Sequence, residues 1–210
     1  MKKMICGACV AILLSLAPLE ALHQAAREGN VELVSQLLRE HDNDNAYVNA
    51  IDTEGRDDSG LLSHATALHV AVENGHYDVV QLLLKSGAFV ELKNRLGDTA
   101  LHAAARTGNV PIAKLLVKAG ADKEAKNNSG STPLRASLKS QIGMLEFLLK
   151  QKCDVNAEDG FGVRPLDWAF AFDVTDAIWN LLLAAGAVHG TSGLARGLVE
   201  TKKIILRDRR

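Results

Sequence analysis

The sequence predicts an all-α fold, a solenoid of stacked helix-turn-helix units joined by short turns. Two observations predict this fold. The tripeptide Ala-Leu-His at residues 67–69 recurs 33 residues later, at residues 100–102. Each copy is followed by a glycine that interrupts the helix and then by a second apolar run at helical spacing. Because neither helix of such a unit can bury its apolar side alone, we expect consecutive copies to pack against one another.

Residues 95–127 form the best-defined unit. Thr99 is predicted to cap a first helix over residues 100–106, because its hydroxyl can accept a first-turn N–H that lacks a partner within the helix. Gly108 is predicted to end that helix, and Asn109 to cap the second one. The apolar face of the second helix consists of Ile112, Leu115, Leu116 and Ala119.

Three further segments repeat the pattern. Thr-Pro-Leu-Arg at residues 132–135 and Arg-Pro-Leu-Asp at residues 164–167 follow at spacings of 33 and 32 residues. Ala-Leu-His at residues 21–23 lies 46 residues before the copy at 67–69, which is one period plus an insertion of about 13 residues. The T-x-L-H-x-A core, the Gly-Asn or Gly-His break and the L-L-x-x-G-A close resemble ankyrin repeats.

The resemblance covers residues 19–191 and implies antiparallel helix pairs with finger-like turns along one edge and a long concave surface. It divides the chain into repeats of about 19–52, 66–94, 95–127, 128–159 and 160–191, with an inserted loop at 53–65. Insertions in repeat proteins lie in loops on one face, so the loop is a candidate contact arm or a tolerated surface loop.

The resemblance also implies roles for individual residues. The repeated histidine is structural in the family, which we carry over to His23, His69 and His102. Equivalent histidines lie about 8–10 Å apart, too far for one metal ion to bridge, and no cofactor motif is found. The family's variable positions predict a partner-binding set of Glu73, Asn74, Arg95, Leu96, Asp98, Arg106, Thr107, Asn128, Ser129, Ser131, Lys139, Ser140, Phe161 and Phe172.

Composition limits the kind of partner. The formal net charge is −1, and 47% of residues are hydrophobic while 4% are aromatic. This balance fits one domain with an aliphatic core, and it lacks the basic stripe of a nucleic-acid binder. We therefore expect no nucleic-acid partner. The family resemblance implies that the partner is another protein, and we expect a monomeric chain.

The two ends depart from the repeat pattern. Residues 1–18 resemble a secretory signal peptide, because Lys2 and Lys3 precede an uncharged apolar run that is too short for a comfortable membrane span. We expect a periplasmic or secreted protein; the alternative is a cytoplasmic one whose residues 1–18 cap the first repeat. Residues 192–210 carry six basic and two acidic residues and form a capping helix or a basic tail.

The fourth repeat is predicted to be the softest point of the stack. Arg135 replaces the histidine, Gln141 stands near the usual helix-break glycine, and Lys152-Cys153 replaces the Gly-Ala close. Without glycine, a less favourable residue must adopt the left-handed conformation that ends the helix.

Most of the aromatic residues lie in the fifth repeat. Trp168 and Trp179 are predicted to be core residues that seal the stack, because of their helical spacing. Phe161 at a finger and Phe172 near the end of the first helix are predicted to be exposed contacts for a partner.

The predicted function is non-catalytic binding of a protein partner on the concave face. One alternative is an obligate subunit of an envelope complex that docks through the aromatic fifth repeat. A remote alternative is an enzyme that uses Cys153 or the polar loops within residues 41–58, although no nucleophile–base signature supports it.

Overall fold

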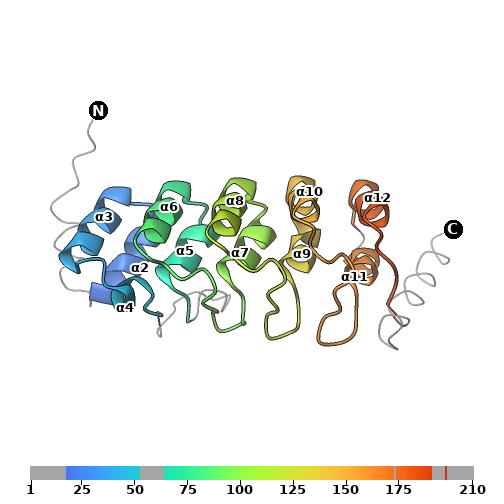
Figure 1. The fold of residues 1–210 in the computed structure, drawn as a ribbon, viewed down its shortest axis with the longest axis horizontal. Coiled ribbons are helices and arrows are strands. Elements are labelled where there is room, and N and C mark those ends of the chain that lie inside the picture. Colours follow the sequence, from blue (N-terminus) through green and yellow to red (C-terminus); the bar gives the residue numbers. More distant parts are fainter. Residues whose placement is uncertain (1–17, 53–63, 173, 191–196, 198–210) are drawn as a thin grey trace. The chain divides into compact units, whose positions relative to one another are not determined.

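A computed structural model describes residues 18–52, 64–172, 174–190 and 197. Regular structure in these residues is helical, apart from an isolated bridge between Ile51 and Thr66, and successive helix pairs follow one another along the chain (Figure 1). The predicted all-α repeat fold is confirmed. Contacts divide the chain into two compact units, unit 1 up to Arg95 and unit 2 from Leu96.

Unit 1 contains two helix pairs that pack on each other. The first helices of the pairs, α2 and α5, contact each other, and so do the second helices, α3 and α6. Leu22, Leu38, Leu68 and Leu83 are among its fully buried side chains. The helices of unit 1 are α2 (Pro18–Glu28), α3 (Val31–Glu40), α4 (Asn45–Val48), α5 (Ala67–Glu73) and α6 (Tyr77–Lys85).

A short helix, α4, lies where the sequence predicts only a polar loop. Asp42 and Asn43 make the turn with φ angles of 50° and 51°, and the Asp44 carboxylate accepts the N–H of Ala46 at 3.1 Å to cap α4. The helix buries Val48, which is 1% exposed. Its formation therefore depends on tertiary burial as well as on local turn chemistry.

Hydrogen bonds join the residues that precede and follow the inserted loop of unit 1. The N–H of Asp52 donates to the carbonyl of Ala65 at 2.9 Å, and the N–H of His64 donates to the carbonyl of Asp52 at 3.0 Å. Residues 53–63 lie outside the described part, and so do residues 1–17 and most of residues 192–210. The contact arm, the signal peptide and the C-terminal cap or tail therefore stay predictions. No helix within the described residues is long and apolar enough to cross a membrane.

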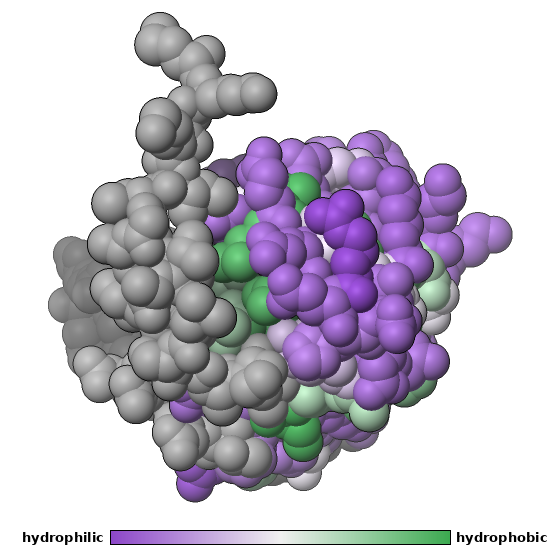
Figure 2. Space-filling view, turned by 90° about the vertical axis from the view of Figure 1, so that its left-hand side faces the viewer, coloured by the Kyte–Doolittle hydropathy of each residue, from purple (hydrophilic) through white to green (hydrophobic). Residues whose placement is uncertain are grey.

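The first repeat presents charged side chains outward, as expected for an end repeat. Figure 2 views the molecule from the end at α2 and α3, where the described surface is largely hydrophilic with a few hydrophobic residues between. Arg27 is half-buried, and the exposed charged residues of these helices are Glu28, Glu32, Arg39 and Glu40.

Unit 2 repeats the same packing. Its first helices pack side by side, with α9 in contact with both α7 and α11, and each contributes a leucine that is at most 2% exposed: Leu101, Leu134 and Leu166. This buried row is the expected signature of stacked units. The helices are α7 (Ala100–Thr107), α8 (Val110–Lys118), α9 (Pro133–Ala136), the 3-10 turn η1 (Ser137–Lys139), α10 (Ile142–Lys150), α11 (Pro165–Phe172) and α12 (Asp176–Ala184).

Local chemistry sets the helix ends of unit 2 as the sequence predicts. Thr99 is the N-cap of α7, and Gly108 ends α7 with a left-handed φ of 74°. The side-chain oxygen Oδ1 of Asn109 accepts the N–H of Ile112 at 3.1 Å and caps α8. In the fourth repeat the first helix is shortened to α9 and η1, and Lys152 takes the left-handed position with a φ of 61°.

Candidate partner-binding surface

The repeated histidines form hydrogen bonds at helix caps and at neighbouring turns. In α7, His102 Nδ1 accepts the Thr99 N–H at 3.2 Å and lies 3.0 Å from the Thr99 hydroxyl. The other ring nitrogen must then carry the proton, and it donates to the Ser131 carbonyl at 2.8 Å. His69 makes the same cap with Thr66, and His23 Nε2 lies 3.0 Å from the Ala65 carbonyl. The rings of His102 and His23 therefore hold first helices against the turns beside them, and the ring of His69 completes a helix cap.

An aspartate takes this place in the fifth repeat. Asp167 is fully buried, and its carboxylate accepts the N–H groups of Arg164 at 3.2 Å and Gly190 at 2.9 Å. His189 Nδ1 lies 2.6 Å from the other oxygen of this carboxylate. Asp167 thus fixes His189 and Gly190 to α11, as His102 and His23 fix earlier turns.

The fingers of unit 2 form a backbone-linked row. The N–H of Asn128 donates to the Leu96 carbonyl at 3.1 Å, and the N–H of Gly160 donates to the Ser129 carbonyl at 2.8 Å. The tips expose Leu96, Asn128, Ser129 and Phe161, which we call the finger row. Phe161 is 60% exposed and Leu96 is 41% exposed. Four residues predicted to bind a partner therefore lie along one ordered edge.

Two predicted contact residues in the fingers are buried instead. The Asp98 carboxylate accepts the Asn127 side-chain N–H at 2.7 Å, and the Asn127 oxygen accepts the Ser131 N–H at 2.9 Å. Asp98 is 6% exposed and Ser131 is 2% exposed. The prediction that these two side chains face a partner is wrong, because they hold the turn together.

A second cluster combines cations and aromatic rings from neighbouring repeats. The Arg135 guanidinium lies 4.4 Å from the centroid of the Trp168 ring, and the Lys139 ammonium lies 3.9 Å from that of Phe172. The two rings stack, with centroids 5.2 Å apart and an interplanar angle of 28°. We call these four residues the basic–aromatic patch. Only Lys139 and Phe172 belong to the predicted partner-binding set.

The other two residues of the patch, Arg135 and Trp168, can be found from their spacing in the sequence. Trp168 follows Arg135 by 33 residues, and Phe172 follows Lys139 by the same distance. Residues about one period apart lie near each other on adjacent repeats, so a cation and an aromatic residue at this spacing predict contact. Arg135 and Lys139 are four residues apart in one repeat, and Trp168 and Phe172 are four residues apart in the next. This spacing places both cation–aromatic pairs on one face.

Asp159 connects the basic–aromatic patch to the finger row. One carboxylate oxygen accepts the N–H of Phe161 at 2.9 Å, and the other accepts the Trp168 indole N–H at 2.7 Å. The latter oxygen also lies 3.5 Å from Arg135 Nε. Burial lowers the pKa of Arg135 and the Asp159 charge opposes that shift. One buried carboxylate therefore orients the exposed Phe161 and the rings of the patch together.

The tryptophans are less buried than predicted. Trp168 and Trp179 are both half-buried. Trp168 cannot be a core residue, because its ring lies between Arg135 and Phe172 and its indole N–H needs the Asp159 carboxylate. Trp179 packs against Phe170 and His189, with centroids 5.9 Å and 6.1 Å away.

The other predicted residues lie at the ends of first helices, apart from Arg95, which lies in the turn between α6 and α7. In unit 2, Thr107 is exposed, while Arg106 and Ser140 are half-buried. Two of these hydroxyls are used within the chain: Thr107 donates to Ala103 at 3.1 Å, and Ser140 donates to Ser137 at 2.8 Å. In unit 1, Glu73 is half-buried, and Asn74 and Arg95 are exposed.

Cys153 is poorly suited to nucleophilic catalysis. Burial, and then the Glu124 carboxylate, raise the pKa of its thiol to about 12, so the thiol stays protonated near neutral pH. Within the described residues, no group of three or more His, Cys, Asp or Glu side chains is arranged to hold a metal ion.

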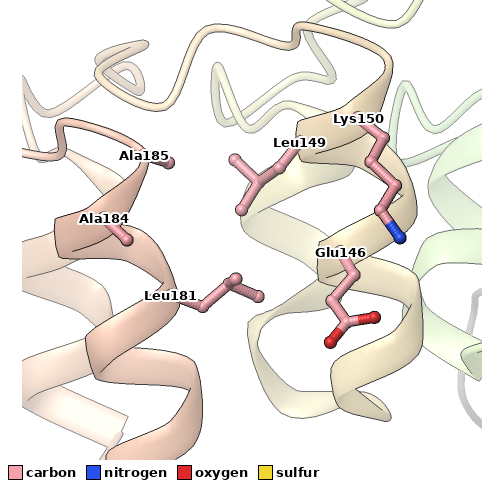
Figure 3. A pocket seen from close by; sticks show the side chains of 6 residues that line it. All are labelled: Glu146, Leu149, Lys150, Leu181, Ala184 and Ala185. Carbon is pink, nitrogen blue, oxygen red and sulfur yellow. The ribbon is translucent and has the colours of Figure 1, made fainter.

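A shallow pocket lies between the second helices of the last two repeats. Figure 3 shows Leu149 of α10 and Leu181 of α12 on its facing sides, with the polar groups of Glu146 and Lys150 on the α10 side. Ala184 and Ala185 complete the lining. None of the residues predicted to bind a partner lines this pocket.

Comparison with protein families finds two matches. The sequence model described as ankyrin repeats in many copies matches residues 68–117, and that of the single ankyrin repeat matches residues 21–53. Both matched segments begin near an Ala-Leu-His motif.

Curated relatives match over shorter segments. The Notch-regulated ankyrin repeat-containing protein A of Danio rerio is 35% identical over 81 residues, covering 39% of this chain and 64% of that protein. The Notch-regulated ankyrin repeat-containing protein of Homo sapiens is 37% identical over 74 residues, covering 35% of this chain and 57% of that protein. A transient receptor potential cation channel subfamily A member 1 homolog of Caenorhabditis elegans is 40% identical over 78 residues, covering 37% of this chain and 6% of that protein. The chain thus spans less than two thirds of each of these relatives.

Proposed function

This chain is an ankyrin-repeat protein, and on that premise we propose that it is a non-catalytic module that binds another protein through the finger row and the basic–aromatic patch of unit 2. Ankyrin repeats generally mediate protein–protein interaction. A repeat stack supplies an extended surface whose side chains vary while the packing beneath them stays the same. The proposal assigns the contact residues to unit 2.

The exposure of Phe161 carries the proposal. A large aromatic side chain that is 60% exposed has a hydrophobic cost in water, and binding a partner removes that cost. Its finger is held by the Asp159 carboxylate and by the Gly160–Ser129 hydrogen bond, so little conformational entropy is lost when it is buried. Ordered aromatic residues of this kind are typical of interface hot spots.

The test is affinity purification of the tagged full chain from its native host, with quantitative mass spectrometry. Phe161→Ala is compared with Phe89→Ala, a control in which an exposed phenylalanine of unit 1 is truncated in the same way. We expect a protein that is retained by the wild type and by the control and is depleted at least about tenfold with Phe161→Ala. Equal recovery with both variants would refute a contact through the finger row.

A second candidate is an obligate subunit that docks through its fifth repeat. Leu183 is 46% exposed and Val188 is 50% exposed, which favours a further apolar contact there. Solution mass separates the two functions. A soluble monomer supports transient binding, whereas a chain that is insoluble without a partner supports the obligate subunit. The signal-peptide prediction has its own test, N-terminal sequencing of the protein from a periplasmic extract.

A further inference from the structure

We infer that the basic–aromatic patch selects an acidic segment of a protein partner, an inference that rests on the proposed function and names the chemistry of the partner. Two cations four residues apart cover two stacked rings that are also four residues apart. The rings of Trp168 and Phe172 supply an apolar surface, and Arg135 and Lys139 place positive charge against it. A segment that presents carboxylates to the cations and an apolar side chain to the rings complements both parts.

The two cations differ in how far they are already neutralised. Arg135 faces Asp159 at 3.5 Å and donates to the Ser131 hydroxyl at 3.0 Å, so its charge is largely used within the chain. Lys139 is exposed, and its ammonium lies over the Phe172 ring. Among residues 18–52, 64–172 and 174–190, no carboxylate lies within ion-pair distance of Lys139. Lys139 is therefore the cation that an incoming carboxylate neutralises.

The ring beneath Lys139 strengthens that attraction. Phe172 excludes water from one side of the ammonium, and a charge pair in a partly dehydrated place interacts more strongly than one in bulk water. A basic segment meets repulsion at the same point, so the patch discriminates between partners as well as attracting them.

An acidic protein segment fits the patch better than a nucleic acid. Nucleic-acid binding needs several cations along a phosphate backbone and a basic domain, whereas this chain has a net charge of −1. The patch offers one cation that no described carboxylate neutralises.

The experiment selects binders from a displayed library of random peptides, with the full chain as bait. Five baits are used: the wild type, Lys139→Glu, Lys139→Arg, Lys114→Glu and Phe161→Ala. Lys114 is an exposed lysine of α8, so its reversal makes the same change in net charge at the second helix of a repeat. Circular dichroism of each bait checks that the fold is kept.

We expect acidic residues to be enriched among peptides bound by the wild type, Lys139→Arg and Lys114→Glu, and not among those bound by Lys139→Glu. The best acidic peptide should bind Lys139→Glu about tenfold more weakly than the wild type. Bound peptides that depend on Phe161 but show no acidic enrichment would overturn this inference and leave the proposed function standing. Failure to select any peptide above background would count against the proposed function, and the inference would fall with it.

Discussion

Replacing His102 with alanine is expected to destabilise unit 2 by about 3 kcal/mol. The ring closes the cap of α7 by accepting the Thr99 N–H at 3.2 Å, and loss of such a cap costs about 1 kcal/mol. It also donates to the Ser131 carbonyl at 2.8 Å, and leaving that carbonyl buried without a donor costs about 1–3 kcal/mol. Water cannot easily replace the ring, because His102 is 1% exposed and Ser131 is 2% exposed.

Urea unfolding followed by tryptophan fluorescence measures this loss directly. Both tryptophans of the chain, Trp168 and Trp179, lie in unit 2, so their emission follows the unit that contains His102. Extrapolation to zero denaturant gives the free energy of unfolding for the wild type and the variant. The matched control is Lys114→Ala on exposed α8 surface, expected to change that free energy by at most about 0.5 kcal/mol. A loss below about 1 kcal/mol for His102→Ala, or an equal loss in the control, would refute the assigned role.

Three further predictions concern the same unit. Lys152→Gly should raise the free energy of unfolding, measured by urea denaturation, by about 1 kcal/mol, because Lys152 has a left-handed φ of 61° that glycine adopts without strain. Lys150→Gly within α10 should lower that free energy by about 1 kcal/mol. Two changes of the same sign would contradict the backbone argument. Gly130→Ala should destabilise the fingers, because the added methyl group would meet a backbone N–H of the next finger. Gly143→Ala should stabilise α10 by about 0.5–1 kcal/mol, because the space around Gly143 is open. The melting temperature of Gly143→Ala should therefore be higher than that of the wild type, and that of Gly130→Ala lower. The Cys153 thiol, with its pKa raised to about 12, should resist iodoacetamide at pH 8 in the native protein and react in urea, as peptide mass spectrometry can follow. The unfolded thiol loses its proton near pH 9 and the folded one near pH 12, so the contribution of Cys153 to stability should be constant below pH 9 and fall between these values. Fast native alkylation at pH 8 would show that the thiol is accessible.

Features governed by short-range chemistry could be predicted from the sequence. Thr99, Gly108 and Asn109 set the ends of α7 and α8, because a cap or a left-handed turn involves only atoms within a few residues. The absence of glycine at the end of α10 likewise identified a strained position, which Lys152 occupies.

Features governed by contacts between repeats were harder to predict. Helical spacing alone placed Trp168 in the core, yet its position depends on Arg135 and Asp159, which belong to other parts of the repeat stack. The variable position of Asp98 in the family predicts a contact with a partner, but Asp98 is buried and its carboxylate accepts the side-chain N–H of Asn127 from the next finger. A pattern within one repeat does not reveal such partners, whereas pairing residues one period apart would have found the contact between Arg135 and Trp168.

The most direct test of the binding surface is photo-crosslinking in the native host. A photoreactive amino acid is placed at Phe161 in one protein and at Lys114 in another, both exposed positions of unit 2 on different elements. We predict a covalent adduct to a second protein from position 161 and none from position 114. Adducts of equal yield from both positions, or an adduct from position 114 alone, would contradict binding through the finger row.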